Sequence, residues 1–248
     1  MTSVEHERVI ALQLAQRAYS YSLFHVVFGV KPSQDIVDTV FTQDTVNNLN
    51  VYLDNLKQSS KANLAEKDLQ GTSITVEQAI QRAHACVMQY MAGEGTAIED
   101  LIAQYTRFFM VPGLSYVYPW ESTYTNSNKM MMQESTLEVR QYYHEAGFKL
   151  QSEKHFPDDH IAAMMDYLGR MSQRAYEAYA DGNDAEVLSI LQTQATFINA
   201  HILNWIGEFI EKLMKCEEDS PYKDFACCMA AIVFVDMQFI IDLTTELA

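Results

Sequence analysis

Glycine and proline are scarce in this chain, with nine and five residues respectively among 248. An all-β sandwich or barrel connects many short strands by tight turns and would need more of both residue types. Hydrophobic residues make up 48% of the sequence, enough to build a substantial core. We therefore predict an all-α fold, and the chain is long enough for one well-buried domain or two small subdomains.

Apolar residues recur at helical spacing through much of the chain. The first predicted helix runs from Val4 to Phe28, and a second begins near Ser33 with a break around residues 42–45. Three polar pairs have the spacing of a capping box, in which two side chains satisfy free backbone N–H groups at a helix start. These pairs are Thr75/Gln78, Thr96/Glu99 and Ser135/Glu138.

The C-terminal part is predicted to contain a long helix through Ile206 to Met214 and a final helix that begins at Pro221. Serine caps helix starts and proline suits the first helical position, so Ser220 followed by Pro221 is a consistent start. The most apolar stretch, residues 225–241, carries Asp236 and falls short of the ~20 apolar residues of a typical membrane span. We expect a buried helix there and no integral membrane segment.

The segment 112–128 is rich in Tyr, Pro, Ser and Asn and cannot sustain helical periodicity. We interpret it as a hinge between N-terminal and C-terminal helical halves. Exchange of helices across such a hinge would join two chains. The sequence therefore leaves open whether the protein is a monomer or a helix-swapped homodimer.

Acidic residues outnumber basic ones by 33 to 17, which gives a formal charge of −16. This charge repels phosphate backbones, so we expect no nucleic-acid partner. It would attract a cationic peptide over a Debye length of roughly 8 Å at physiological salt. Ordinary solubility of an acidic protein explains the same charge equally well.

The four cysteines form neither a C-x-x-C pair nor a regular disulfide pattern, which favours reduced thiols. The residues after Met1 are polar, without a basic region followed by an apolar one, so we expect no export signal. Both features indicate a cytoplasmic location.

Two tracts of the sequence give most of the information about function. The first, residues 101–124, combines aromatic residues that look exposed with a proline-containing loop, and the second is Pro157-Asp158-Asp159-His160 at a helix start. One aspartate can cap that helix, while another carboxylate could receive an arginine through two charge-assisted hydrogen bonds. We prefer Asp159 as the arginine-binding residue. The combination favours a binding protein over an enzyme.

Core packing is the structural alternative for the aromatic residues of the first tract. Leu101 and Phe109 belong to one apolar stripe of a helix, and such a stripe usually reports packing. For Tyr105, Phe108 and Trp120, the sequence is equally consistent with core packing and with contacts to a peptide.

The same tracts resemble the TorD/DmsD/NarJ family of cytoplasmic redox-enzyme maturation chaperones. Residues 101–109 are similar to the family's helix leading to a Leu-Phe pair, and Pro119-Trp120-Glu121-Ser122-Thr123-Tyr124 is similar to its Pro-aromatic-Glu-Ser-x-Tyr loop. Asp159-His160 matches its Asp-His pair, and His201 and Trp205 follow in a later helix. The resemblance covers nearly the whole chain.

This resemblance implies that residues 1–248 form a single TorD-like helical-bundle domain. It also implies that this domain binds the twin-arginine signal peptide of a molybdenum-cofactor oxidoreductase. Such a chaperone delays export until folding and cofactor insertion are complete, and it could also contact the mature enzyme. The resemblance implies no catalysis and no cofactor held by the chain itself. It assigns Tyr105, Phe108, Phe109 and Trp120 to the apolar part of the peptide site, Asp159 and His160 to its polar end, and Glu121 and Tyr124 to secondary contacts.

Two positions depart from the family pattern. Met110-Val111 stands where the family commonly has a glycine before the proline, and Met164 stands where it often has an acidic residue. Asp166 keeps a nearby acidic position. These departures leave the identity of the client enzyme open.

Other function classes have weaker support. A helical di-metal enzyme would need Glu-x-x-His pairs from facing helices, and nucleotide hydrolysis would need a Gly-rich loop ending in Lys-Ser/Thr; the sequence has neither. We expect no metal site. The main alternative is a helical self-associating interaction protein that binds no signal peptide. The histidines are scattered singly, at His25, His84, His144, His155 and His201.

Overall fold

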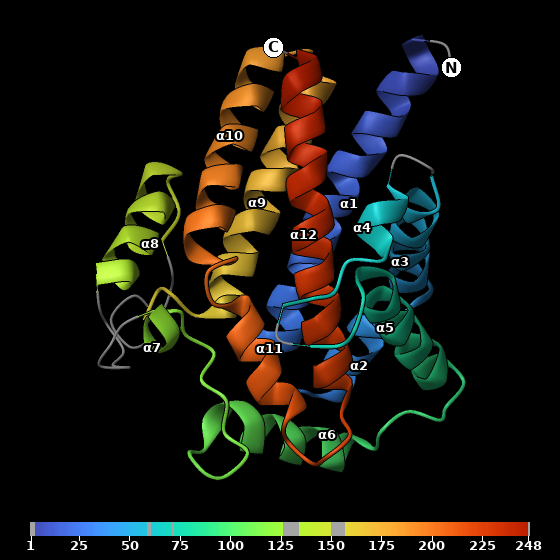
Figure 1. Cartoon of the computed structure of the whole chain (residues 1–248), viewed down its shortest axis with the longest axis vertical. Coiled ribbons are helices and arrows are strands. Elements are labelled where there is room, and N and C mark those ends of the chain that lie inside the picture. Colours follow the sequence, from blue (N-terminus) through green and yellow to red (C-terminus); the bar gives the residue numbers. More distant parts are fainter. Residues whose placement is uncertain (1–2, 59–60, 71, 126–133, 150–156, 248) are drawn as a thin grey trace.

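The computed structural model describes residues 3–58, 61–70, 72–125, 134–149 and 157–247 (Figure 1). Within these ranges the chain is all-α, as predicted, with two isolated β-bridges and no strand. The helices are α1 (Ser3–Gly29), α2 (Gln34–Val40), α3 (Gln43–Leu56), α4 (Ala62–Ala65), α5 (Val76–Met91), α6 (Ile98–Tyr105), η1 (Thr106–Met110), α7 (Ser122–Thr125), α8 (Glu134–Glu145), α9 (Ile161–Ala180), α10 (Asp184–His201), α11 (Ile206–Met214) and α12 (Pro221–Leu247).

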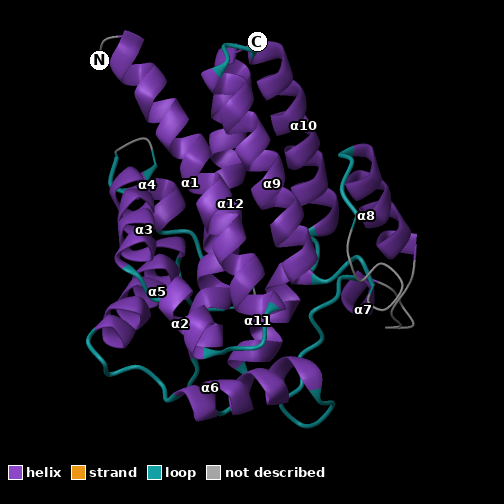
Figure 2. Ribbon diagram, turned by 180° about the vertical axis from the view of Figure 1, so that it is seen from behind, coloured by secondary structure: helices purple, strands orange, loops and turns teal. Residues whose placement is uncertain are grey.

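Four long helices, α1, α9, α10 and α12, run side by side and form the centre of the domain (Figures 1 and 2). Helices α3 and α5 cover one flank, α8 lies on the opposite flank, and α6 crosses one end. Glycines allow α1 and α9 to approach closely: a Cβ atom at Gly29 would lie 2.8 Å from the Ala162 Cβ, and one at Gly169 would lie 3.3 Å from the Ser22 backbone nitrogen. The closest approach therefore depends on positions without a side chain.

Helix α12 confirms the prediction of a buried C-terminal helix. Its 27 residues make it long and apolar enough to cross a membrane, and 72% of its apolar window is buried inside the fold. The expectation that this segment is too short for a span was wrong, because the helix extends beyond residues 225–241 at both ends. Its apolar surface is used for contacts with α1, α5, α10 and α11.

The predicted helix starts have mixed outcomes. The Thr75/Gln78 capping box is confirmed, with hydrogen bonds of 3.0 and 3.2 Å between backbone and side chains. The Thr96/Glu99 box is wrong, because Ala97 is the N-cap of α6 and forms no side-chain cap. Ser135 lies inside α8. Spacing alone does not decide which residue takes the extended conformation of an N-cap.

The predicted long helix that ends at Met214 is divided into α10 and α11. In the turn between them, the indole N–H of Trp205 donates to the His201 carbonyl at 2.6 Å and satisfies one of the free carbonyls at the end of α10. Apolar periodicity continues across this turn, so the turn could not be predicted from the sequence.

The predicted hinge is irregular over residues 112–121 and then forms the short helix α7. Its last residues, 126–128, lie outside the described part of the chain, as does His155. Helix α9, which follows the hinge, packs along α1 of the same chain.

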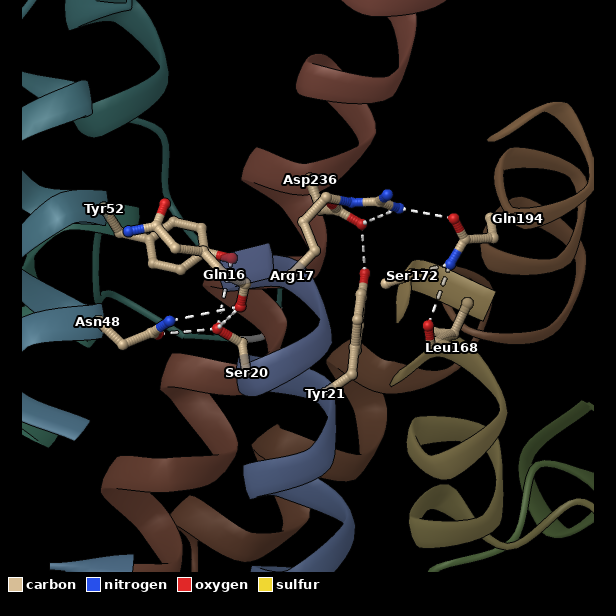
Figure 3. A network of polar contacts seen from close by, with 10 residues as sticks. All are labelled: Gln16, Arg17, Ser20, Tyr21, Asn48, Tyr52, Leu168, Ser172, Gln194 and Asp236. Atoms are coloured by element: carbon tan, nitrogen blue, oxygen red, sulfur yellow. Dashed lines mark hydrogen bonds and ion pairs between the residues drawn. The ribbon is translucent and has the colours of Figure 1, made fainter. Parts of the chain in front are cut away.

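A buried polar network joins the central helices (Figure 3). Arg17 of α1 pairs with Asp236 of α12, and their side chains are only 2% and 1% exposed. Arg17 also donates to Gln194 Oε1 of α10 at 2.9 Å, and the Tyr21 hydroxyl donates to Asp236 at 2.5 Å. Buried charges are tolerated only with such partners. The network therefore fixes how α1, α10 and α12 sit against one another.

Candidate functional site

The two functional tracts meet in space. Trp120 and His160 form an antiparallel bridge, and backbone hydrogen bonds of 2.8 and 3.1 Å lie on either side of it. Residues 119–124 and 157–161 therefore form one unit, which we call the motif clamp. The clamp places the Trp-Glu pair of one tract directly beside the Asp-His pair of the other.

Asp159 holds the motif clamp together from inside. Its side chain is fully buried, with Oδ2 accepting the Ser122 N–H at 2.8 Å and Oδ1 accepting the Thr136 hydroxyl at 3.0 Å. These bonds fasten α7 and α8 to the clamp. Both oxygens have partners within the fold, which is not the arrangement expected of an open arginine-binding carboxylate.

Asp158, the neighbouring residue, is the aspartate that binds an arginine in this structure. Its carboxylate is 1% exposed and accepts from Arg140 Nε of α8 at 2.5 Å, while 34% of the Arg140 side chain is exposed. The Tyr143 hydroxyl of α8 donates to the Asp158 carbonyl at 3.0 Å. A buried carboxylate needs partners of this kind, so the Arg140 contact stabilises both the clamp and α8.

His160 is the N-cap of α9, since its Nδ1 accepts the Ala162 N–H at 3.1 Å. The Trp120 ring meets the imidazole edge-on, with 5.4 Å between the centroids. Burial lowers the pKa of His160 to about 4, and the nearby His25 acts in the same direction. The neutral form suits this role, because a protonated Nδ1 has no lone pair for the cap.

Glu121 connects the clamp to the turn between α10 and α11. Its carboxyl is buried, with Oε2 3.1 Å from His201 Nδ1 and Oε1 accepting from Asn204 Nδ2 at 3.4 Å. Burial raises the pKa of Glu121, and the hydrogen bond to His201 opposes that shift. These bonds position the loop at Glu121 against the turn between α10 and α11.

The aromatic residues of α6 and η1 lie in the core. Tyr105, Phe108 and Phe109 are 7%, 0% and 6% exposed, so the interpretation of these rings as exposed was wrong. Phe109 meets the rings of Phe28 and Tyr222 at centroid distances of 6.0 and 5.5 Å. The π-helical turn η1 was not predicted.

Tyr124 is half-buried and connects the clamp to this aromatic core. Its ring lies 5.1 Å from Trp205, which lies 5.8 Å from Phe209, which in turn lies 6.5 Å from Phe109. Lys212 Nζ is 4.2 Å from the centre of the Tyr124 ring. All eight predicted site residues therefore belong to one connected region.

Comparison with known families gives a direct assignment. The family model described as nitrate reductase delta subunit matches residues 73–211, more than half of the chain, and this range includes both functional tracts. The chain belongs to this family. The resemblance seen in the sequence is thereby confirmed.

Relatives of this nitrate reductase delta subunit family member include proteins named chaperone protein TorD. The one from Vibrio cholerae serotype O1 (strain ATCC 39315) is 25% identical over 136 residues, 55% of this chain and 59% of the relative. Those from Shewanella sp. (strain ANA-3) and Photobacterium profundum are 26% and 22% identical, over 49% and 57% of this chain and 52% and 64% of their own lengths. The chain thus spans less than two thirds of the length of each of these three relatives.

The family member also carries an exposed apolar loop, residues 110–118, that was not predicted from the sequence. Met110, Val111, Leu114 and Tyr118 are all exposed, and Leu114 projects fully into solvent. The only sequence signal was that Met110-Val111 departs from the family pattern. Within the described residues, no group of three or more His, Cys, Asp or Glu side chains is arranged to hold a metal ion.

Proposed function

We propose that this chain is a cytoplasmic chaperone that binds the twin-arginine signal peptide of a molybdenum-cofactor oxidoreductase. It holds the peptide until folding and cofactor insertion are complete, and it also contacts the mature part of that enzyme. This function makes and breaks no covalent bond. In this proposal, the residues that form or support the site are Tyr105, Phe108, Phe109, Trp120, Glu121, Tyr124, Asp159 and His160.

The observation that carries the proposal is the motif clamp, in which the buried carboxylates of Asp158 and Asp159 lie in the segment that pairs with Trp120, and the exposed apolar loop 110–118 precedes the clamp in the chain. A peptide with arginines followed by an apolar stretch would need carboxylates for its arginines, which the clamp holds inside the fold until it opens, and an apolar surface for the rest. The formal charge of −16 favours approach of such a cationic ligand. The relatives named as chaperones support the same class of function.

Trp120 provides a specific contact for the peptide backbone. Its Nε1–H is buried and has no hydrogen-bond partner within the described residues. An unsatisfied buried donor costs about 1–3 kcal/mol. A carbonyl of the bound peptide would satisfy it when the clamp opens slightly to admit the ligand.

Calorimetric titration with a synthetic twin-arginine signal peptide tests the function. The native chain should bind this peptide, and replacement of both arginines by lysine should weaken binding about tenfold or more, because lysine cannot form the two parallel hydrogen bonds of a guanidinium. Equal affinity for the two peptides, or no binding of either, would contradict the proposal.

Trp120→Phe tests the role of the indole donor while an aromatic ring is kept. Loss of one hydrogen bond should weaken peptide binding by about 1 kcal/mol. Tyr90→Phe is the control, since it removes one polar group from an aromatic ring on α5, away from the clamp. The control should bind the peptide as the native chain does. Equal losses of peptide affinity in both variants would show that the Trp120 indole does not contact the peptide.

A further inference from the structure

Helix α8 lies on the domain in the manner of a bound amphipathic peptide. Thr136, Val139 and Tyr143 are its buried residues, at the i, i+3, i+7 spacing of one helix face, while Leu137 is 61% exposed. This spacing of buried residues is characteristic of a helix held in a groove. The opposite face of α8 is open to solvent.

The surface beneath α8 is aromatic. The Tyr142 ring lies 5.2 Å from Phe197 and 5.6 Å from His201, and the Tyr143 ring lies 5.2 Å from Tyr167. The Tyr167 hydroxyl is buried and has no hydrogen-bond partner among the described residues. A surface of aromatic rings with an unsatisfied hydroxyl is suited to contact with a peptide that supplies both apolar atoms and an acceptor.

Arg140 occupies the acidic end of this surface, with its Nε 2.5 Å from Asp158. The carboxylate is buried and the guanidinium is partly in solvent, so the arginine approaches Asp158 from outside. An arginine of another chain could approach from the same side. Next to this contact, α8 presents an apolar residue one position before the arginine and a tyrosine three positions after it.

We propose that α8 is an internal mimic of the signal peptide, and that a peptide arginine displaces Arg140 from Asp158 while neighbouring apolar residues contact the rings beneath α8. This inference rests on the proposed function and identifies Asp158, not Asp159, as the carboxylate that receives the peptide arginine. Asp159 instead positions the site through its bonds to α7 and α8.

Such an exchange is energetically plausible because one arginine replaces another on the same carboxylate. Removing Arg140 without a replacement would leave Asp158 without this partner in a buried position, which is unfavourable. The peptide supplies the missing charge, and the net charge of −16 favours its arrival. Helix α8 thus covers the aromatic surface until a peptide with an arginine replaces Arg140.

Arg140→Gln tests the exchange, because the variant no longer competes for Asp158. Its affinity for the twin-arginine peptide, measured by calorimetry, should rise about tenfold, the lower range of coupling between close charge pairs. The lysine-substituted peptide should gain less. Arg82→Gln is the control, since Arg82 forms a similar half-exposed ion pair with Asp224, at 2.8 Å between α5 and α12. That control should bind like the native chain.

An unchanged or lower affinity of a folded Arg140→Gln chain would overturn the inference. A second measurement does not depend on a signal peptide: methylguanidinium should raise the midpoint of thermal unfolding of Arg140→Ala, and should raise it more than that of the native chain. If no chain binds any peptide, the proposed function fails. Rescue by methylguanidinium would then still support an exchangeable arginine site on Asp158, and absence of rescue would overturn it.

Discussion

The neutral imidazole of His160 links the start of α9 to the loop at Trp120. His160 caps α9 through Nδ1 and packs against Trp120, so its protonation state is coupled to the geometry of the clamp. Glu121 and Asp159 likewise use their side chains for internal bonds. These three residues therefore position the site through the fold that they stabilise.

The lowered pKa of His160, about 4, predicts acid sensitivity. An unfolded histidine titrates near pH 6.5, so below that value the unfolded chain binds a proton that the folded chain excludes. Stability should therefore fall as pH decreases from about 6.5 to 4, by at most about 1.4 kcal/mol per pH unit from this group. Urea denaturation at several pH values measures the slope.

His160→Asn separates this effect from other titrations, because asparagine also caps helices but does not titrate. Glu121, whose pKa is raised, acts in the opposite direction in this pH range and contributes equally to both chains. The variant should lose less stability than the native chain over pH 6.5 to 4. Identical slopes for native and His160→Asn chains would contradict the assignment.

At the level of the helices, prediction from sequence was successful where apolar residues recur at helical spacing over many turns and the pattern has a clear end. Tyr21 and Phe24 belong to the recurring apolar positions that located α1, which ends at Gly29, one residue after the predicted end at Phe28. The turn after His201 could not be predicted, because buried residues continue on both sides of it and a side-chain bond from Trp205 stabilises it. The resemblance identified the two tracts that the fold brings together. Their burial could not be predicted, because the contacts join residues far apart in the chain.

The buried pair of Arg17 and Asp236 gives the sharpest prediction about helix packing. Asp236→Ala leaves the Arg17 charge unpaired in the core and should lower the free energy of unfolding by about 3–5 kcal/mol. Replacing both residues, as Arg17→Met with Asp236→Leu, should recover most of that loss. Urea denaturation followed by circular dichroism measures the three values.

Asp242→Ala is the control for this series, since Asp242 is an exposed carboxylate on the same helix. Its effect should stay within about 0.5 kcal/mol of the native value. A loss below 1 kcal/mol for Asp236→Ala, or a double variant no more stable than the single one, would show that the network does not fix the helix arrangement.

For the whole molecule, the motif clamp connects the predicted hinge to the part of the chain that follows it. The loop at Trp120 is bonded to the start of α9, and α9 packs along α1. A ligand bound at the clamp would therefore be linked through α9 to α1 in the N-terminal half. In the proposed function, the acidic character of the chain favours the approach of cationic ligands, and the clamp selects among them.

The most direct test of signal-peptide binding at the motif clamp is hydrogen–deuterium exchange of the native chain with and without the twin-arginine peptide, read by mass spectrometry. We predict slower exchange in residues 119–124 and 157–161, faster exchange in α8 as Arg140 is displaced, and little change with the lysine-substituted peptide at the same concentration. Unchanged exchange in the clamp, or protection confined to the α3 and α5 flank, would contradict the account.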